Sequence, residues 1–157
     1  MAESEPEILL VEDNPNDVKL ALHAFQKHRL ANRVHVVRDG VEALEFLFCT
    51  DRHAHRRIED APRLILLDLK LPLMDGIEVL RRIKSDRRTS LTPVVMLTAS
   101  REECDIVETY KLGVNSYIVK PVDFVQFSEA VRQIGYYWLM LNEPPPGVRA
   151  RLPERGV

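Results

Sequence analysis

Acidic side chains follow directly after two short apolar runs of this chain. Glu12 and Asp13 follow the run Ile8–Val11, and Asp68 follows the run Leu64–Leu67. Such runs are typical of strands buried in a parallel sheet, whereas carboxylates are rarely buried without a partner. Because ligand sites form beyond the carboxyl ends of parallel strands, we expect the three acids to converge there. Three acids repel one another, and their oxygen-only ligand set suits Mg2+.

A hydroxyl and an amine end two further apolar runs, at Thr98 and Lys120. Together with the acids, they suit the transfer of a phosphoryl group to a carboxylate. A metal held by Asp13 and Asp68 would neutralise the phosphoryl oxygens. Thr98 would donate a hydrogen bond to these oxygens, and Lys120 would add a charge-assisted contact. The central acid, Asp68, is the predicted nucleophile, because a carboxylate can form an acyl phosphate.

Strand patterns alternate with helical patterns along the chain. The strands are expected at Ile8–Val11, Val34–Val37, Leu64–Leu67, Val94–Leu97 and Tyr117–Val119. Apolar residues at helical spacing lie between them, with Gly113 as the end of the fourth helix and a last helix from Asp123 to about Leu141. This alternation predicts an α/β fold, a flavodoxin-like doubly wound five-stranded parallel sheet. Right-handed crossovers favour the strand order 2-1-3-4-5.

The site residues stand in motifs that resemble the receiver domain of response regulators in two-component signalling. The motifs are Val11-Glu12-Asp13-Asn14, Leu66-Leu67-Asp68, Leu71-Pro72-Leu73-Met74-Asp75-Gly76, Leu97-Thr98-Ala99 and Lys120-Pro121. The resemblance covers roughly residues 7–141, which we expect to form the receiver domain, and leaves residues 142–157 as a flexible tail. It implies a single-domain signalling switch in a phosphorelay. Such a switch catalyses its own phosphorylation and later hydrolyses its own acyl phosphate.

The resemblance also implies a role for each site residue. Asp68 would be the phosphoacceptor. Asp13 and Asp68 would ligate Mg2+, joined by the backbone carbonyl of Lys70, and Glu12 would act through a water molecule.

On the phosphoryl side, the resemblance assigns Thr98 and Lys120 to binding of the phosphoryl group. Tyr117 would turn inward with Thr98 on activation. The Lys120–Pro121 peptide bond would be cis. Lys70 and Ser100 flank the site and are expected to tune the lifetime of the phosphoryl group.

Four further segments resemble the small regulators partnered with phytochrome histidine kinases. They are Glu12–Asp17, His35–Gly40, the extended loop Arg52–Pro62 and the aromatic Tyr136-Tyr137-Trp138. The implied phosphodonor is a sensor histidine kinase of the phytochrome type.

The last predicted helix carries more apolar residues than one sheet face can cover. Phe124, Phe127, Val131, Ile134, Trp138 and Leu141 form a stripe at helical spacing, and Tyr136–Leu141 is apolar all the way round. An exposed patch of this size predicts a partner surface. We therefore expect a homodimer through the face of the fourth helix, fifth strand and fifth helix. The predicted contact residues are Phe124, Phe127, Tyr136, Tyr137, Trp138 and Met140.

Composition narrows the remaining function classes. A formal net charge of -2 gives no general attraction to nucleic acid or to anionic membranes, and no apolar run approaches a membrane span. We expect a cytoplasmic protein in which Cys49 and Cys104 form no disulfide and His53 and His55 are exposed loop histidines.

Three rival functions remain open at this point. An aspartate-nucleophile phosphatase would need an Asp-x-Asp pattern at the first strand, but Asn14 and Pro15 follow Asp13. A phosphorylation-independent binding module would need no complete site, whereas every site position here is filled. A flavin-binding domain would need a phosphate loop rich in glycine and hydroxyl groups, which is missing after the first strand.

Overall fold

Five parallel strands form a single sheet in the computed structural model, which describes residues 7–30 and 33–146. The strands are β1 Ile8–Val11, β2 Val34–Val37, β3 Leu64–Leu67, β4 Val94–Thr98 and β5 Ser116–Val119. Their order in the sheet is β2-β1-β3-β4-β5, which confirms the predicted topology. The chain reverses its direction of travel across the sheet between β1 and β3, so ligand sites are favoured at the carboxyl ends of these two strands.

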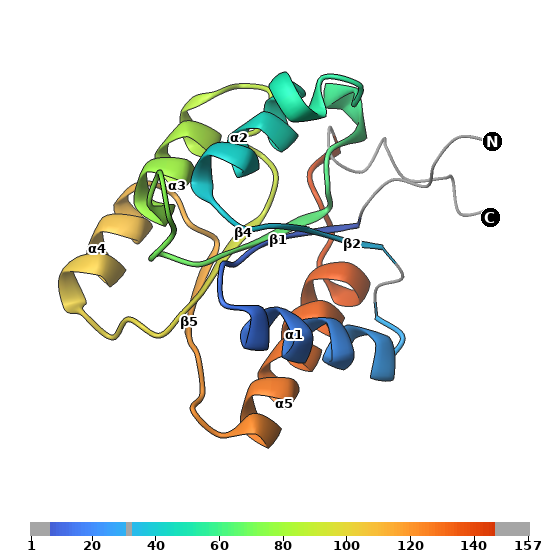
Figure 1. The fold of residues 1–157 in the computed structure, drawn as a ribbon, viewed down its shortest axis with the longest axis vertical. Coiled ribbons are helices and arrows are strands. Elements are labelled where there is room, and N and C mark those ends of the chain that lie inside the picture. Colours follow the sequence, from blue (N-terminus) through green and yellow to red (C-terminus); the bar gives the residue numbers. More distant parts are fainter. Residues whose placement is uncertain (1–6, 31–32, 147–157) are drawn as a thin grey trace.

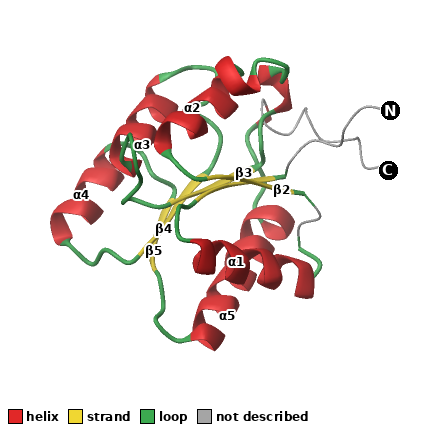
Figure 2. Ribbon diagram, viewed as in Figure 1, coloured by secondary structure: helices red, strands yellow, loops and turns green. Residues whose placement is uncertain are grey.

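Helices cover both faces of the sheet (Figure 1). One face carries α1 Pro15–Lys27 and α5 Phe124–Gly135, and the other carries α2 Gly40–Phe48, α3 Gly76–Ser85 and α4 Glu103–Lys111. Figure 2 shows the sheet nearly edge-on between these two helical layers. No helix among the described residues is long and apolar enough to cross a bilayer.

The sheet divides the hydrophobic core into two clusters. On β3, Leu64 and Leu66 pack with the α1 and α5 side, whereas Ile65 and Leu67 pack with the α2 and α3 side. All four side chains are fully buried. A strand covered on both faces therefore reads as an unbroken apolar run, as the sequence showed.

Helix α4 is packed more loosely than its neighbours. Thr109 is its one buried residue, and Val107 and Tyr110 are each about half exposed. The turn after the helix passes through Gly113, whose φ of +96° lies in the region that favours glycine. This confirms the predicted end of the helix.

The chain continues beyond α5 as a π-helix, Tyr136–Leu141, where α-helical turns were predicted. A π-helix bonds each residue to the fifth one along, so Leu139, five residues after Ile134, turns into the core. Leu141 is 60% exposed and Trp138 is only partly buried. The predicted apolar stripe is therefore confirmed from Phe127 to Trp138 and wrong at its two ends, Phe124 and Leu141.

The segment between α2 and β3 contains two short 3-10 helices, Asp51–His53 and Ile58–Asp60. His53 is buried, because its ring packs edge-on to Phe46 at 5.1 Å and its Nε2 lies 3.0 Å from a carboxylate oxygen of Glu42. The prediction of exposed loop histidines is therefore wrong for His53 and confirmed for His55.

Candidate functional site

The three predicted acids meet at the carboxyl edge of the sheet. β1 and β3 are neighbours whose last residues, Val11 and Leu67, are register partners, so the residues after them emerge side by side. Carboxylate oxygens of Glu12, Asp13 and Asp68 all lie within 4.8 Å of one another. Glu12 and Asp68 are buried, whereas Asp13 is exposed. The convergence expected from the strand ends is confirmed.

Lys120, which follows β5, reaches into the same cluster. Its Nζ donates to Oδ2 of Asp68 at 3.0 Å and to Oδ2 of Asp17 at 2.8 Å, and it also donates to Glu12. The lysine side chain is only 10% exposed. One ammonium therefore faces three carboxylates, and the exposed Asp13 adds a fourth acid beside them.

The pKa values of the cluster reflect both the burial of its groups and the charges around them. Burial raises the pKa of the Glu12 carboxyl from 4.5 to about 7, and the charge of Asp68 adds to the rise against the opposing hydrogen bond from Lys120. Burial by itself would lower the pKa of Lys120, but hydrogen bonds to Asp17 and Glu12 and the charge of Asp68 raise it above its ordinary value. A divalent cation would relieve the repulsion, and a donor set made of carboxylates fits Mg2+.

Thr98 and Tyr117 both contact Ser100, in the loop after β4. Thr98 is 1% exposed, and its Oγ1 accepts a hydrogen bond from the Ser100 N–H at 3.4 Å. The phenol of Tyr117 donates to the Ser100 carbonyl oxygen at 2.9 Å, and burial raises the pKa of this phenol. Thr98, expected to bind a phosphoryl group, and Tyr117, the predicted switch residue, are thus connected through the backbone of Ser100.

Beyond Asp13 the site opens into a pocket of about 600 Å³. The residues that line it are Asp13, Leu69, Lys70, Leu71, Pro72, Asp75, Ile77 and Asp105. The pocket provides solvent access to the exposed side of the acid cluster. The role of the Lys70 carbonyl as a metal ligand stays a prediction.

Helix α3 begins directly against the peptide that carries Asp68. The Gly76 N–H donates to the Leu69 carbonyl at 2.7 Å. A Cβ atom at Gly76 would lie 2.1 Å from the Asp68 carbonyl oxygen, so no larger residue fits without a shift of the backbone. The glycine of the predicted loop motif therefore sets how close α3 stands to Asp68.

The Lys120–Pro121 peptide bond is trans, as are the other peptide bonds of the described ranges. The cis prediction is wrong in this structure. The trans isomer is intrinsically favoured before proline by about 0.5–1 kcal/mol, and in this conformation the Lys120 N–H donates to the Thr98 carbonyl at 2.7 Å.

Sequence reasoning missed two acids of the site. Asp17 lies in the first turn of α1 and contacts Lys120, and Asp105 lies in the first turn of α4 and accepts from the Ser100 hydroxyl at 2.6 Å. A usable signal existed for Asp17, because a helix that starts at Pro15 places residue 17 above the end of β1. No comparable signal marks Asp105, whose partner is set by the path of a loop.

The residues predicted for a dimer face divide into two groups. Those that are 46–56% exposed are Phe124, Tyr136, Tyr137 and Met140. Trp138 is partly buried against the core. Phe127 is 3% exposed and packs with Val131 and Ile134, so its assignment to a contact face is wrong.

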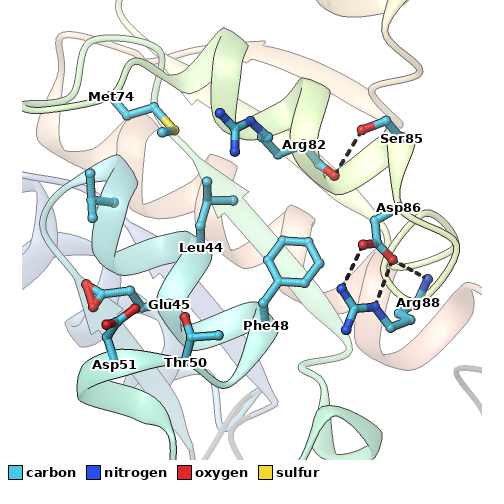
Figure 3. A pocket seen from close by; sticks show the side chains of 11 residues that line it. Leu44, Glu45, Phe48, Thr50, Asp51, Met74, Arg82, Ser85, Asp86 and Arg88 are labelled. Atoms are coloured by element: carbon cyan, nitrogen blue, oxygen red, sulfur yellow. Dashed lines mark hydrogen bonds and ion pairs between the residues drawn. The ribbon is translucent and has the colours of Figure 1, made fainter.

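A second hollow of about 430 Å³ lies between α2 and α3 (Figure 3). Leu44, Phe48 and Met74 line it together with the ion pair of Asp86 and Arg88, whose atoms are 2.9 Å apart. It contains none of the predicted site residues. The acid cluster, and not this hollow, is therefore the candidate site.

The family model of the response regulator receiver domain matches residues 8–132. The chain therefore belongs to the receiver-domain family of response regulators. This agrees with the fold, with the acid cluster and with the positions of Thr98 and Lys120.

Several relatives of the chain are phytochrome response regulators. The phosphorylated cyanobacterial phytochrome response regulator RcpA has 40% identity and a TM-score of 0.84, covering 90% of this chain and 99% of RcpA. The bacteriophytochrome response regulator AtBRR has 51% identity and a TM-score of 0.68, covering 90% of this chain and 100% of AtBRR.

A third relative, response regulator Rcp1 of Synechocystis sp., is 37% identical over 132 residues, which are 84% of this chain and 88% of Rcp1. A Mn2+-bound structure of Rcp1 has 34% identity and a TM-score of 0.83, and the match covers 90% of this chain and 99% of the Rcp1 chain. The predicted resemblance to phytochrome regulators is confirmed at the level of homology.

Proposed function

We propose that this chain is a phosphorylation-dependent response regulator that accepts a phosphoryl group on Asp68 when Mg2+ is bound. The observation that carries the proposal is the buried Asp68 carboxylate, 3.0 Å from Lys120 Nζ and inside a cluster of acids. Asp13, Asp68 and the Lys70 carbonyl would hold Mg2+, with Glu12 acting through water. The bound ion would neutralise the phosphoryl oxygens. The Mn2+-bound structure of Rcp1 supports a divalent cation site in this family.

The residues of the chain then have distinct tasks in phosphoryl transfer. An Asp68 carboxylate oxygen attacks the phosphorus of a phosphohistidine, so a P–O bond forms while the P–N bond breaks, and the leaving nitrogen keeps the electron pair of that bond as neutral imidazole. Lys120 exchanges its carboxylate contacts for the phosphoryl oxygens, and Thr98 donates its hydroxyl hydrogen to them. In the later hydrolysis, water attacks the phosphorus and Asp68 leaves as a carboxylate.

The proposed donor is a sensor histidine kinase of the phytochrome type, because RcpA and AtBRR are phytochrome response regulators. The receiver unit would comprise residues 7–141, with residues 142–157 as a tail. Most of that tail lies outside the described residues. A cytoplasmic location also belongs to this proposal.

A homodimer through α4, β5 and α5 would carry the output. The support is a set of exposed apolar side chains on these elements and on the π-helix: Val107, Tyr110, Phe124, Tyr136, Tyr137 and Met140. Light scattering at tens of micromolar, with and without phosphorylation, tests this part. A monomer under both conditions would contradict it.

The phosphorylation itself is tested by a phosphate-affinity gel after incubation with Mg2+ and acetyl phosphate. We expect a shifted band that disappears in Asp68→Asn and in EDTA. If no shift occurs although Mg2+ binds, the assignment of Asp68 fails. The chain would then act as a phosphorylation-independent binding module.

A further inference from the structure

Ser100 is a meeting point of three parts of the molecule. Its N–H lies 3.4 Å from Thr98 Oγ1, its carbonyl accepts from Tyr117 at 2.9 Å, and its hydroxyl donates to an Asp105 carboxylate oxygen at 2.6 Å. The last of these bonds is charge-assisted and the shortest of the three. Ser100 is therefore held most firmly from the side of α4.

Asp105 provides this hold from a helix that has few other attachments. Thr109 is the one buried residue of α4, and its hydroxyl bonds back to carbonyls of the same helix. The Glu102 side chain does not cap the helix, and the ion pair between Arg81 and Glu108, at 3.8 Å, is exposed. An exposed ion pair contributes little. The Glu102 N–H also donates to the Ser100 hydroxyl, at 3.3 Å. The position of the first turn of α4 therefore depends strongly on this hydroxyl, whose shorter bond is the one to Asp105.

We propose that Asp105 is a positioning residue that couples a phosphoryl group on Asp68 to helix α4. This proposal rests on the phosphorylation of Asp68 proposed above. The carboxylate holds the Ser100 backbone where it can accept Tyr117 while Thr98 stays within reach of the phosphoryl oxygens. The Ser100 N–H uses Thr98 Oγ1 as an acceptor, so the hydroxyl hydrogen of Thr98 is left for a phosphoryl oxygen, and the arrangement therefore favours phosphoryl binding. By linkage, an interaction that stabilises this arrangement also strengthens binding of the phosphoryl group at Asp68. Loss of the hydrogen bond between Asp105 and Ser100 therefore weakens that binding.

The test uses beryllofluoride, an analogue of the phosphoryl group, titrated with saturating Mg2+ onto the full chain and followed by fluorine NMR. Asp105→Ala and Ser100→Ala should each weaken beryllofluoride binding about fivefold, the lower end of typical coupling between sites. Asp105→Asn keeps an acceptor for the Ser100 hydroxyl and should recover most of the affinity. Glu103→Ala, an exposed acid on the same turn, is the matched control and should bind like the unmodified chain.

Two readouts separate coupling from general damage. In Asp105→Ala the affinity for Mg2+ alone should fall much less than the affinity for beryllofluoride, because Asp105 lines the pocket beside Asp13 but is not one of the three clustered acids. In a Tyr117→Phe background, Asp105→Ala should have less than about half its effect on binding, since coupled residues are not additive.

The proposal is overturned if Asp105→Ala and Ser100→Ala bind beryllofluoride like the unmodified chain. It is also overturned if the effects of Asp105→Ala and Tyr117→Phe simply add. If the unmodified chain itself binds no beryllofluoride in the presence of Mg2+, the proposed function fails, and the proposed role of Asp105 fails with it. The two failures are thus distinguishable.

Discussion

Two partly buried lysines stand at opposite edges of the same sheet, in opposite electrostatic surroundings. Lys120, at the carboxyl edge, donates to carboxylates of Glu12, Asp17 and Asp68. Lys84, in α3, donates at the amino edge to neutral acceptors: the carbonyls of Ser90 and Thr92, each at 3.1 Å, and the side-chain oxygen of Asn115 at 2.9 Å.

The pKa values of the two lysines move in opposite directions. Burial lowers the pKa of Lys84 to about 8, because none of its neutral acceptors carries a compensating charge. At Lys120 the same cost of burial is outweighed by carboxylates, and the pKa rises. The charge of the partners, and not burial, decides whether a lysine stays a dependable cation. The carboxyl edge thereby keeps a dependable cation among its acids, whereas at the amino edge Lys84 ties neighbouring loops together.

The largest effect is expected when Lys120 is removed. Lys120→Met leaves buried carboxylates without their cation, and loss of one partner of a buried ion pair costs about 3 kcal/mol or more. We expect a fall of this size in the free energy of unfolding, measured by urea denaturation in EDTA at a pH above 7. Stability equal to that of the unmodified chain would show that the acids do not depend on the lysine.

A slightly smaller effect should follow from Mg2+. At a concentration 100-fold above its Kd, a ligand of the folded state stabilises it by about 2.7 kcal/mol. The unmodified chain and Lys84→Met should gain equally, because Lys84 lies at the other edge, whereas Asp13→Asn should lose most of the gain. Thermal unfolding with and without Mg2+ measures this. An unequal gain in Lys84→Met would mean that the two edges are coupled.

Lys84→Met should cost less, about 1 kcal/mol at neutral pH, because it removes hydrogen bonds from three acceptors. The pH dependence is the sharper measurement. Lys84 has a pKa of about 8 when folded and 10.5 ordinarily, so between these values the unfolded chain binds more protons. The stability that Lys84 contributes is therefore complete above pH 10.5 and lost as the pH falls through 8.

The check is the difference in unfolding free energy between the unmodified chain and Lys84→Met. This difference should grow in favour of the unmodified chain as the pH rises from 8. A difference that stays constant across this range would contradict the lowered pKa.

The smallest expected change in stability, about 0.5 kcal/mol, belongs to Asn115→Asp. The new carboxylate would form an exposed ion pair with Lys84, and such pairs contribute little. This variant places a carboxylate beside Lys84 while keeping an acceptor for the Val94 N–H, now bonded at 2.8 Å. The pKa of Lys84 should rise slightly, because an interaction of about 0.5 kcal/mol raises a pKa by about 0.4, and the growth in stability above pH 8 should become smaller. NMR titration of the Lys84 side chain measures the pKa, and an unchanged value would contradict the role of partner charge.

The sequence predicted the strand order and the meeting of Glu12, Asp13 and Asp68, because both follow from local patterns and from the geometry of parallel sheets. A strand buried on both faces leaves little choice of residue, so the acid after it stands out. The partner of Asp105 could not be predicted in this way, since it depends on how a loop folds back. The π-helix was missed because Ile134, Trp138 and Leu141 fit an α-helical period equally well.

The burial of His53 illustrates the same limit on a single residue. Its position in a polar, irregular segment suggested exposure, but the ring packs onto Phe46, which lies seven positions earlier. Periodicity predicts which face of an element turns inward. It does not predict which loop residue will cover the edge of a neighbouring helix.

Gly76 determines which part of the site can move. There is no space for even one carbon atom between α3 and the Asp68 peptide, so the backbone of the proposed phosphoacceptor is held firmly against this helix. Across the site, Thr98 and Tyr117 meet at Ser100, which is tied to the loosely packed helix α4. If Asp68 is phosphorylated as proposed, its backbone has little room to move, and we expect the loop around Ser100 and helix α4 to adjust to the added charge.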